Sequence, residues 1–488
     1  MKENKGQSIA SSMVYKSLER YVVLVFQTIV QIVIARILSP TDYGIVAMMT
    51  VFISVAHVFI ANGFNSAVIQ KKEADNRDFG TALLLNFLIG AFLYAILFFA
   101  APAISRFYNE PQLKVCLRVL ALVLPIGSVS SIQNAVAVRR MMFRNLFVCN
   151  VIGSVSSGIV GVVMALLGFG YWALIGQQLT SVIVVAIALT YHATWKPRFD
   201  YVAKSAKEMF SFGWKILGAG LINTIYNELN SLIIGKKYTS ADLSFYTKGK
   251  LYPYTIVRGV DSALQSVTLS AFSKKQTDYA YLRQLLKKTM TSNSYILMPM
   301  LMLLGVCAHP FIELLLTEKW LPVVPYMQIC CFTFAFHPMA NIDMQVIAAI
   351  GRSDLRLKLE FIKKPFGILL LILAIPYGPL AIAVSAAVTS LFSLLVGAIA
   401  CHKCVHYTVW QHFHDVLPIM LCTVLAGGLT GLVGLVPLPL ILQLLLQGMV
   451  MLGVYIPLTL WLKVPGHSYI FEYVKNNIVN KIFKKHKK

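Results

Sequence analysis

Long apolar stretches separated by short polar connectors follow one another along almost the whole chain. Fourteen of them approach or exceed the roughly 20 apolar residues that a helix needs to cross a bilayer. A backbone in lipid must satisfy its own hydrogen bonds, so the pattern predicts an all-α polytopic membrane protein with about 14 transmembrane helices. The predicted spans are 13–37, 43–66, 80–103, 115–138, 146–168, 171–192, 211–235, 243–270, 288–309, 323–350, 361–376, 379–401, 414–436 and 438–462.

Basic residues divide unevenly between the two sets of connectors. Of the 43 Lys and Arg, 32 fall on the side that holds the N-terminus and nine on the other. Cytoplasmic loops carry such an excess, so both termini are expected in the cytoplasm. Composition agrees, because 57% of the residues are hydrophobic and only 13% are charged. We therefore attribute the net charge of +23 to the loop bias and expect no nucleic-acid partner.

An internal repeat with an offset near 200 divides the predicted helices. The stretch Arg36–Asp42 aligns with Lys236–Asp242, and Gly170–Leu174 resembles Gly378–Ile382. Each copy holds six helices, and an even number preserves orientation, so the copies form parallel repeats. The predicted parts are an N-lobe (1–195), a C-lobe (209–404), two extra helices (412–463) and a basic amphipathic cytoplasmic tail (464–488).

Polar side chains recur at helical spacing inside several predicted spans, where they are costly. Interhelical hydrogen bonds are one explanation, and an Arg258–Asp261 ion pair would be a structural one. Rows of polar residues on four predicted helices, spread over both lobes, favour the wall of a hydrated cavity instead. The polar residues in question are Arg20, Gln27, Gln31, Lys215, Asn223, Asn227, Glu228, Tyr254, Arg258, Asp261, Gln265 and Asn341.

Motifs for enzymatic and metal chemistry give little support to either. The sequence holds no Walker A motif, HExxH or GxSxG. Cys401, Cys404, His406, His412 and His414 have ligand types that suit zinc. They lie at the cytoplasmic end of a predicted span, however, where the cysteines would face lipid or pack against helices. We expect no metal, no cofactor and no catalytic residue.

Several stretches make the sequence familiar: ARILSPTDYGIVAM, GFNSAVIQKKEADNRDFGTALLLN, FYNEPQLKVCLRVLAL and RRMMFRNL. They resemble the polysaccharide-flippase branch of the multidrug/oligosaccharidyl-lipid/polysaccharide exporter superfamily, and within it the lipopolysaccharide and teichuronic-acid exporter subgroup. The resemblance covers nearly the whole chain and is strongest over 1–200.

The resemblance implies a flippase in the bacterial cytoplasmic (inner) membrane that moves undecaprenyl-diphosphate-linked oligosaccharide by alternating access. The polar residues listed above would bind this substrate, except Glu228 and Asp261, which would bind H⁺ or Na⁺. Other expected partners are bilayer lipids and polysaccharide-assembly proteins. Two alternatives stay open: a membrane-embedded oligosaccharide polymerase or glycosyltransferase, and a drug or ion antiporter of the same superfamily.

Overall fold

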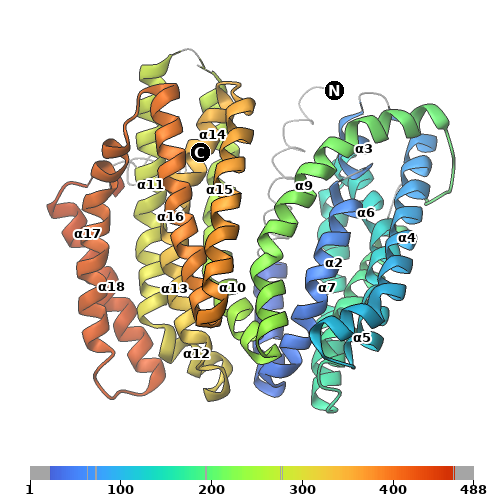
Figure 1. The fold of residues 1–488 in the computed structure, drawn as a ribbon, viewed down its shortest axis with the longest axis horizontal. Coiled ribbons are helices and arrows are strands. Elements are labelled where there is room, and N and C mark those ends of the chain that lie inside the picture. Colours follow the sequence, from blue (N-terminus) through green and yellow to red (C-terminus); the bar gives the residue numbers. More distant parts are fainter. Residues whose placement is uncertain are drawn as a thin grey trace, which may run out of the picture. The chain divides into compact units, whose positions relative to one another are not determined.

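The computed structural model describes residues 22–467 apart from 63, 72–73, 193–194, 275, 277 and 465, and every regular element in these ranges is a helix (Figure 1). Helix packing divides the chain into two compact units, with the boundary between Ser244 and Phe245. The predicted all-α fold is confirmed. The predicted lobe boundaries stay a prediction, and in the structure α9 packs against α2, α3 and α4.

The first unit contains nine helices within the described ranges. They are Val22–Ile37, α2 (Pro40–Asn62), α3 (Phe64–Gln70), α4 (Asn76–Tyr108), α5 (Leu113–Leu120), α6 (Val123–Arg139), α7 (Phe143–Leu166), α8 (Trp172–His192) and α9 (Ala203–Lys237).

The second unit is also helical throughout its described part. Its α-helices are α10 (Ser240–Lys274), which begins just before the boundary, α11 (Tyr279–Val306), α12 (Ala308–Leu316), α13 (Val323–Ala335), α14 (His337–Ala349), α15 (Ser353–Ala374), α16 (Pro379–Val405), α17 (Val409–Val433) and α18 (Leu440–Trp461). Short 3₁₀ turns at Glu318–Trp320 and Ile375–Tyr377 connect some of them.

Ten helical stretches in the described ranges are long and apolar enough to cross a membrane. The other four predicted spans correspond to the shorter apolar helix Val22–Ile37 and to α9, α10 and α15. These last three are long but more polar. Two of them, α9 and α10, carry most of the polar residues that the sequence singled out.

Both copies of the predicted repeat form the same reciprocal helix cap. Ser39 donates its hydroxyl to the Asp42 carboxylate at 2.6 Å, and its own oxygen accepts from the Asp42 backbone N–H at 3.2 Å. Thr239 and Asp242 repeat both contacts at 2.7 and 3.1 Å. A hydroxyl cap with an acid three residues later begins a helix efficiently, so the repeated sequence marks equivalent helix starts.

The core of unit 1 depends on close helix approach at α7. A side chain at Gly158 would lie 2.8 Å from Phe26 and Val30 of the helix Val22–Ile37. Small residues at such contacts let helix backbones approach closely in a membrane protein. The first described helix is therefore seated directly on α7, which brings its polar residues within reach of α7 and α8.

The core of unit 2 is built mainly by α11, α14, α16, α17 and α18 around residues such as Met290 and Cys422. Packing continues past α18, because Val464 is 1% exposed and His467 Nδ1 lies 2.8 Å from the Tyr295 hydroxyl. The packing of unit 2 thus includes residues up to His467. The amphipathic helix predicted for the rest of the tail lies outside the described residues.

Candidate functional site

The two amides predicted on the first span make hydrogen bonds between helices of unit 1. Gln27 Nε2 donates to Ser154 Oγ of α7 at 2.8 Å, and Gln31 Nε2 donates to Gln177 Oε1 of α8 at 3.1 Å. Tyr43 also donates to the Gln31 backbone carbonyl, at 3.4 Å. These contacts are the kind expected from interhelical hydrogen bonding. The role of Gln27 and Gln31 in substrate binding stays a prediction.

The long helix α9 exposes two of its predicted amides. Asn223 and Asn227 are both exposed within unit 1, one helical turn apart, so they share a face of α9. Lys215 lies on the same helix, but its side chain is outside the described part, and Arg20 lies outside the described residues altogether. An exposed pair of amides with four N–H donors and two carbonyls suits sugar hydroxyls.

Glu228 follows these amides and is half-buried. It lines an otherwise almost wholly apolar cavity of about 330 Å³ between α2, α4 and α9. Phe52 and Phe59 of α2 and Leu93 of α4 form part of the wall. A free charge on such a wall is costly and a bound cation would offset it, which suits the predicted role in binding a small cation.

The predicted residues of unit 2 lie on α10 and α14. Tyr254 is 43% exposed and packs its ring 5.9 Å from that of Phe334, and Arg258 is exposed one turn further along α10. Asn341 is half-buried on α14. The side chains of Asp261 and Gln265 are outside the described part, so the predicted Arg258–Asp261 pair stays a prediction.

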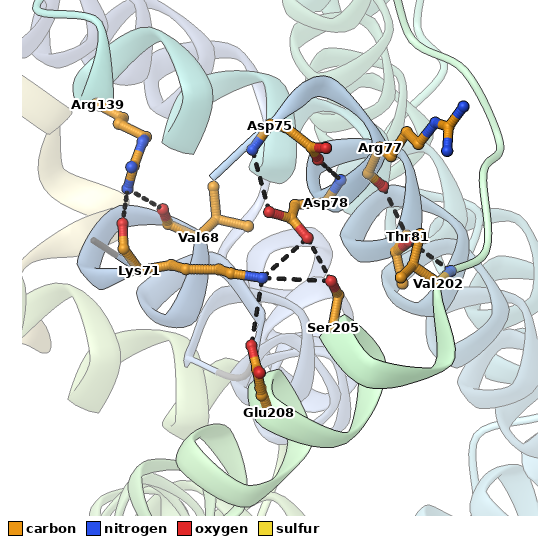
Figure 2. Close-up of polar contacts among 10 residues, drawn as sticks. All are labelled: Val68, Lys71, Asp75, Arg77, Asp78, Thr81, Arg139, Val202, Ser205 and Glu208. Atoms are coloured by element: carbon orange, nitrogen blue, oxygen red, sulfur yellow. Dashed lines mark hydrogen bonds and ion pairs between the residues drawn. The ribbon is translucent and has the colours of Figure 1, made fainter. Parts of the chain in front are cut away.

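A charged network that sequence reasoning did not find holds the beginning of α9. Lys71 Nζ lies 2.9 Å from Asp78 Oδ1, 3.2 Å from Ser205 Oγ and 3.3 Å from Glu208 Oε2. Ser205 also donates its hydroxyl to Asp78. Figure 2 shows Lys71 at the meeting point of these side chains, which come from the start of α4 and the first turns of α9.

Helix caps hold the residues of this network in place. Asp75 and Asp78 form a reciprocal capping box at the start of α4, with contacts of 2.8 and 3.0 Å. Arg139 of α6 donates to the Val68 carbonyl at the end of α3, at 2.9 Å (Figure 2). Burial lowers the pKa of Lys71, but its hydrogen bonds to Asp78 and Glu208 outweigh burial, so this pKa lies above its usual value.

The far end of α9 is fastened to the far end of α4. Lys236 donates to the Phe107 carbonyl, and its ammonium lies 4.8 Å from the centre of the Phe107 ring. The helix that carries Asn223, Asn227 and Glu228 is thus held at both ends by α4 and its connector. Sequence reasoning missed the contact of Lys71 with the start of α9. It used Lys71 and the basic residues at 196–207 only to assign topology, and no local sequence pattern links the two segments.

Comparisons with known proteins agree with this architecture. The chain is 23% identical over 313 residues to teichuronic acid biosynthesis protein TuaB of Bacillus subtilis, a match that covers 62% of each chain. It is 24% identical over 288 residues to succinoglycan biosynthesis transport protein ExoT of Rhizobium meliloti, covering 59% of this chain and 58% of that one. The matches thus span about three fifths of these two relatives.

Solved structures share the fold. A structure titled lipid II flippase MurJ, inward closed conformation, has a TM-score of 0.72 at 15% identity and covers 92% of this chain and 99% of its own. An inward-facing multidrug resistance transporter of the MATE family and MOP superfamily has a TM-score of 0.61 at 14% identity, covering 78% of this chain and 94% of its own. At this identity the likeness concerns the fold alone.

The family resemblance expected from the sequence is confirmed by a direct match. The model of a family described as polysaccharide biosynthesis protein matches residues 33–325, which is more than half of the chain. Together with an all-helical membrane fold, this match makes the chain a member of the polysaccharide biosynthesis protein family.

Proposed function

We propose that the protein moves a lipid-linked oligosaccharide across the bacterial cytoplasmic membrane by alternating access. Family membership carries the proposal, supported by a relative whose name includes biosynthesis transport protein and by the fold of a protein titled lipid II flippase. The substrate class expected from the sequence resemblance is an undecaprenyl-diphosphate-linked oligosaccharide.

The chemistry of the predicted residues fits such a substrate. Its diphosphate is anionic and its glycan is hydrated, so neither crosses hydrocarbon unaided. Arg20, Lys215 and Arg258 would bind the phosphates through charge-assisted hydrogen bonds. Asn223, Asn227, Gln265, Asn341 and Tyr254 would bind sugar hydroxyls. The exposure of Asn223, Asn227, Tyr254 and Arg258 supports this assignment, because each can reach a ligand without unfolding its unit.

An ion is the proposed energy source. Glu228 is the better supported of the two candidate carboxylates, because it borders an almost wholly apolar cavity. There it would take up H⁺ or Na⁺ and release it as the surroundings change. Both termini would lie in the cytoplasm, in keeping with the basic connectors.

A transport assay with a chemical readout tests the proposal and distinguishes a flippase from an enzyme that changes the glycan. Purified protein in liposomes receives a fluorescent undecaprenyl-diphosphate oligosaccharide, and a glycosidase added outside reports how much glycan faces outward. We expect the protected inner-leaflet fraction to become accessible. In a parallel sample without glycosidase, mass spectrometry should show unchanged glycan length. Lengthened or released glycan would establish a polymerase or glycosyltransferase, and unmoved glycan with drug efflux an antiporter.

The ion is tested in the same liposomes by imposing a proton or sodium gradient. Glu228→Gln should remove any acceleration by the gradient while leaving slow gradient-independent movement. Glu313→Gln, on α12, is the matched control because it removes a partly exposed carboxylate in unit 2. Equal acceleration in wild type and Glu228→Gln would rule out Glu228 as the coupling residue.

A further inference from the structure

Three side chains with different metal-ligating atoms meet in the interior of unit 2. Asp343 comes from α14, Cys401 from α16 and His412 from α17. Their ligand atoms all lie within 4.8 Å of one another, and each residue has no exposed surface. The sequence alone predicts no metal at Cys401 and His412, because they lie at the end of a predicted span, and it does not bring Asp343 together with them.

The ring of His412 is oriented by its backbone surroundings. Nδ1 lies 2.9 Å from the Thr408 carbonyl oxygen, which can only accept, so Nδ1 carries a hydrogen and donates. In the neutral ring Nε2 then presents its lone pair, and it points to Asp343 Oδ1 at 2.8 Å. Metal-ligating histidines are commonly held in this way, with the second ring nitrogen bonded to a carbonyl.

The second oxygen of Asp343 is the least satisfied part of the cluster. Oδ2 is buried and has no hydrogen-bond partner among the described residues. The Cys401 thiol hydrogen-bonds to the same carboxylate. Leaving a buried acceptor unpaired costs about 1–3 kcal/mol, and more for a charged group. A proton shared by Asp343 and His412 explains the 2.8 Å contact but gives Oδ2 no partner.

We propose that Asp343, Cys401 and His412 form a binding site for one divalent transition-metal ion of the zinc class. Imidazole nitrogen, thiolate sulfur and carboxylate oxygen are the ligands that zinc takes in proteins. A divalent ion with one thiolate, one carboxylate and a neutral imidazole sums to zero charge, which suits a fully buried site. Asp343 can supply a fourth contact through Oδ2.

The surroundings make this a closed, structural site. The Tyr407 ring lies 4.6 Å from that of His412, and no ligand residue reaches the surface. Bound metal would fasten α14, α16 and α17 to one another within unit 2. Lys363 of α15 is buried, attracts Asp343, and has its ammonium 3.9 Å from Met344 Sδ. Its positive charge opposes the metal, which gives a second test.

Cobalt is the probe, because thiolate ligation to Co²⁺ produces a charge-transfer absorption band. Full-length protein is isolated from cells grown with added zinc or cobalt, and its metal content is measured before any chelator is used. We expect close to one ion per chain and a thiolate–cobalt band. Cys401→Ser should abolish the band, whereas Cys404→Ser, one turn further along α16, should retain both band and metal.

The affinity for Zn²⁺ then distinguishes metal ligands from residues that only lie near the site. With Zn²⁺ and a competing chelator, Cys401→Ser and His412→Gln should weaken binding by more than the roughly 10–100-fold that follows loss of an outer hydrogen-bond partner. Lys363→Met should strengthen it. Wild-type protein from either growth with well below one ion per chain overturns the proposal and leaves a shared proton as the explanation. So does a cobalt band that survives Cys401→Ser.

Should His412→Gln fail to fold, Cys401→Ser still decides the question, because serine nearly preserves the shape of cysteine. These readouts are metal content and absorption, so they do not depend on whether the chain transports oligosaccharide.

Discussion

Lys71 Nζ lies 3.3 Å from Glu208 Oε2 and ties the connector between α3 and α4 to the second turn of α9. The two partners differ in their surroundings. The Glu208 side chain is 48% exposed, whereas Asp78, the other carboxylate on Lys71, is 9% exposed. The same lysine therefore takes part in one solvated ion pair and one buried ion pair.

This difference predicts unequal effects on stability. Lys71→Met leaves Asp78 buried without its cation and should lower the stability of unit 1 by about 2–3 kcal/mol. Glu208→Gln removes only the solvated pair and should cost less than about 1 kcal/mol. Thermal unfolding of the two variants in detergent, followed by size-exclusion chromatography, measures both. Equal losses would show that the network does not divide in this way.

Arg258 is predicted to act in transport rather than in folding. Because it is exposed on α10, Arg258→Gln should leave protein level and melting temperature near wild type while abolishing polysaccharide export. Arg258→Lys should be nearly as poor, because lysine lacks the bidentate fork. Arg283→Gln, an exposed arginine on α11, is the matched control.

The double variant Arg258→Gln with Asp261→Asn tests the structural ion pair. We expect no return of export. Wild-type export by the double variant would remove the phosphate-binding role from Arg258.

Topology is predicted from the basic connectors and is open to a labelling test. All eight cysteines are free, and each is buried except Cys404, which is half-buried. On a background without them, Lys204→Cys in the first turn of α9 should be protected from a membrane-impermeant thiol reagent added to intact cells. Lys114→Cys, also at an exposed position, should be labelled. The reverse pattern would invert the orientation.

The contacts of Val464 and His467 predict where truncation becomes harmful. Ending the chain after His467 should leave the melting temperature unchanged, because the Tyr295 contact remains. Ending it after Lys463 removes buried Val464 and should cost about 1.5–3 kcal/mol from this side chain alone. Equal melting temperatures for the two truncated proteins would show that Val464 and His467 contribute nothing.

Much of the fold follows from local sequence. Apolar length predicted the spans, and the aligned stretches ending at Asp42 and Asp242 predicted equivalent helix starts, which the two caps bear out. The break at the start of α14 was also readable in principle, since Pro338 cannot donate to the preceding turn.

Long-range partners could not be predicted in the same way. Helical spacing placed Gln27 and Gln31 on one face but could not show that Ser154 and Gln177 would meet them. Lys71 and Asp343 each find partners on helices far along the chain. Periodicity reports which face of a helix is polar, whereas only tertiary packing decides what that face contacts.

Helix α9 has 35 residues and is therefore about 52 Å long, against a hydrocarbon core of about 30 Å. Contacts of Lys71 near one end and of Lys236 near the other hold both ends of α9 in place. A helix held in this way cannot tilt as a rigid rod, and it can change shape only by bending between the two contacts. Gly218 lies between the two contacts, glycine favours the helix less than other residues apart from proline, and no neighbouring atom lies within 4 Å of the position a side chain would take there. A movement of Asn223, Asn227 and Glu228 would then be a bend in the middle of α9, while the contacts at both of its ends remain.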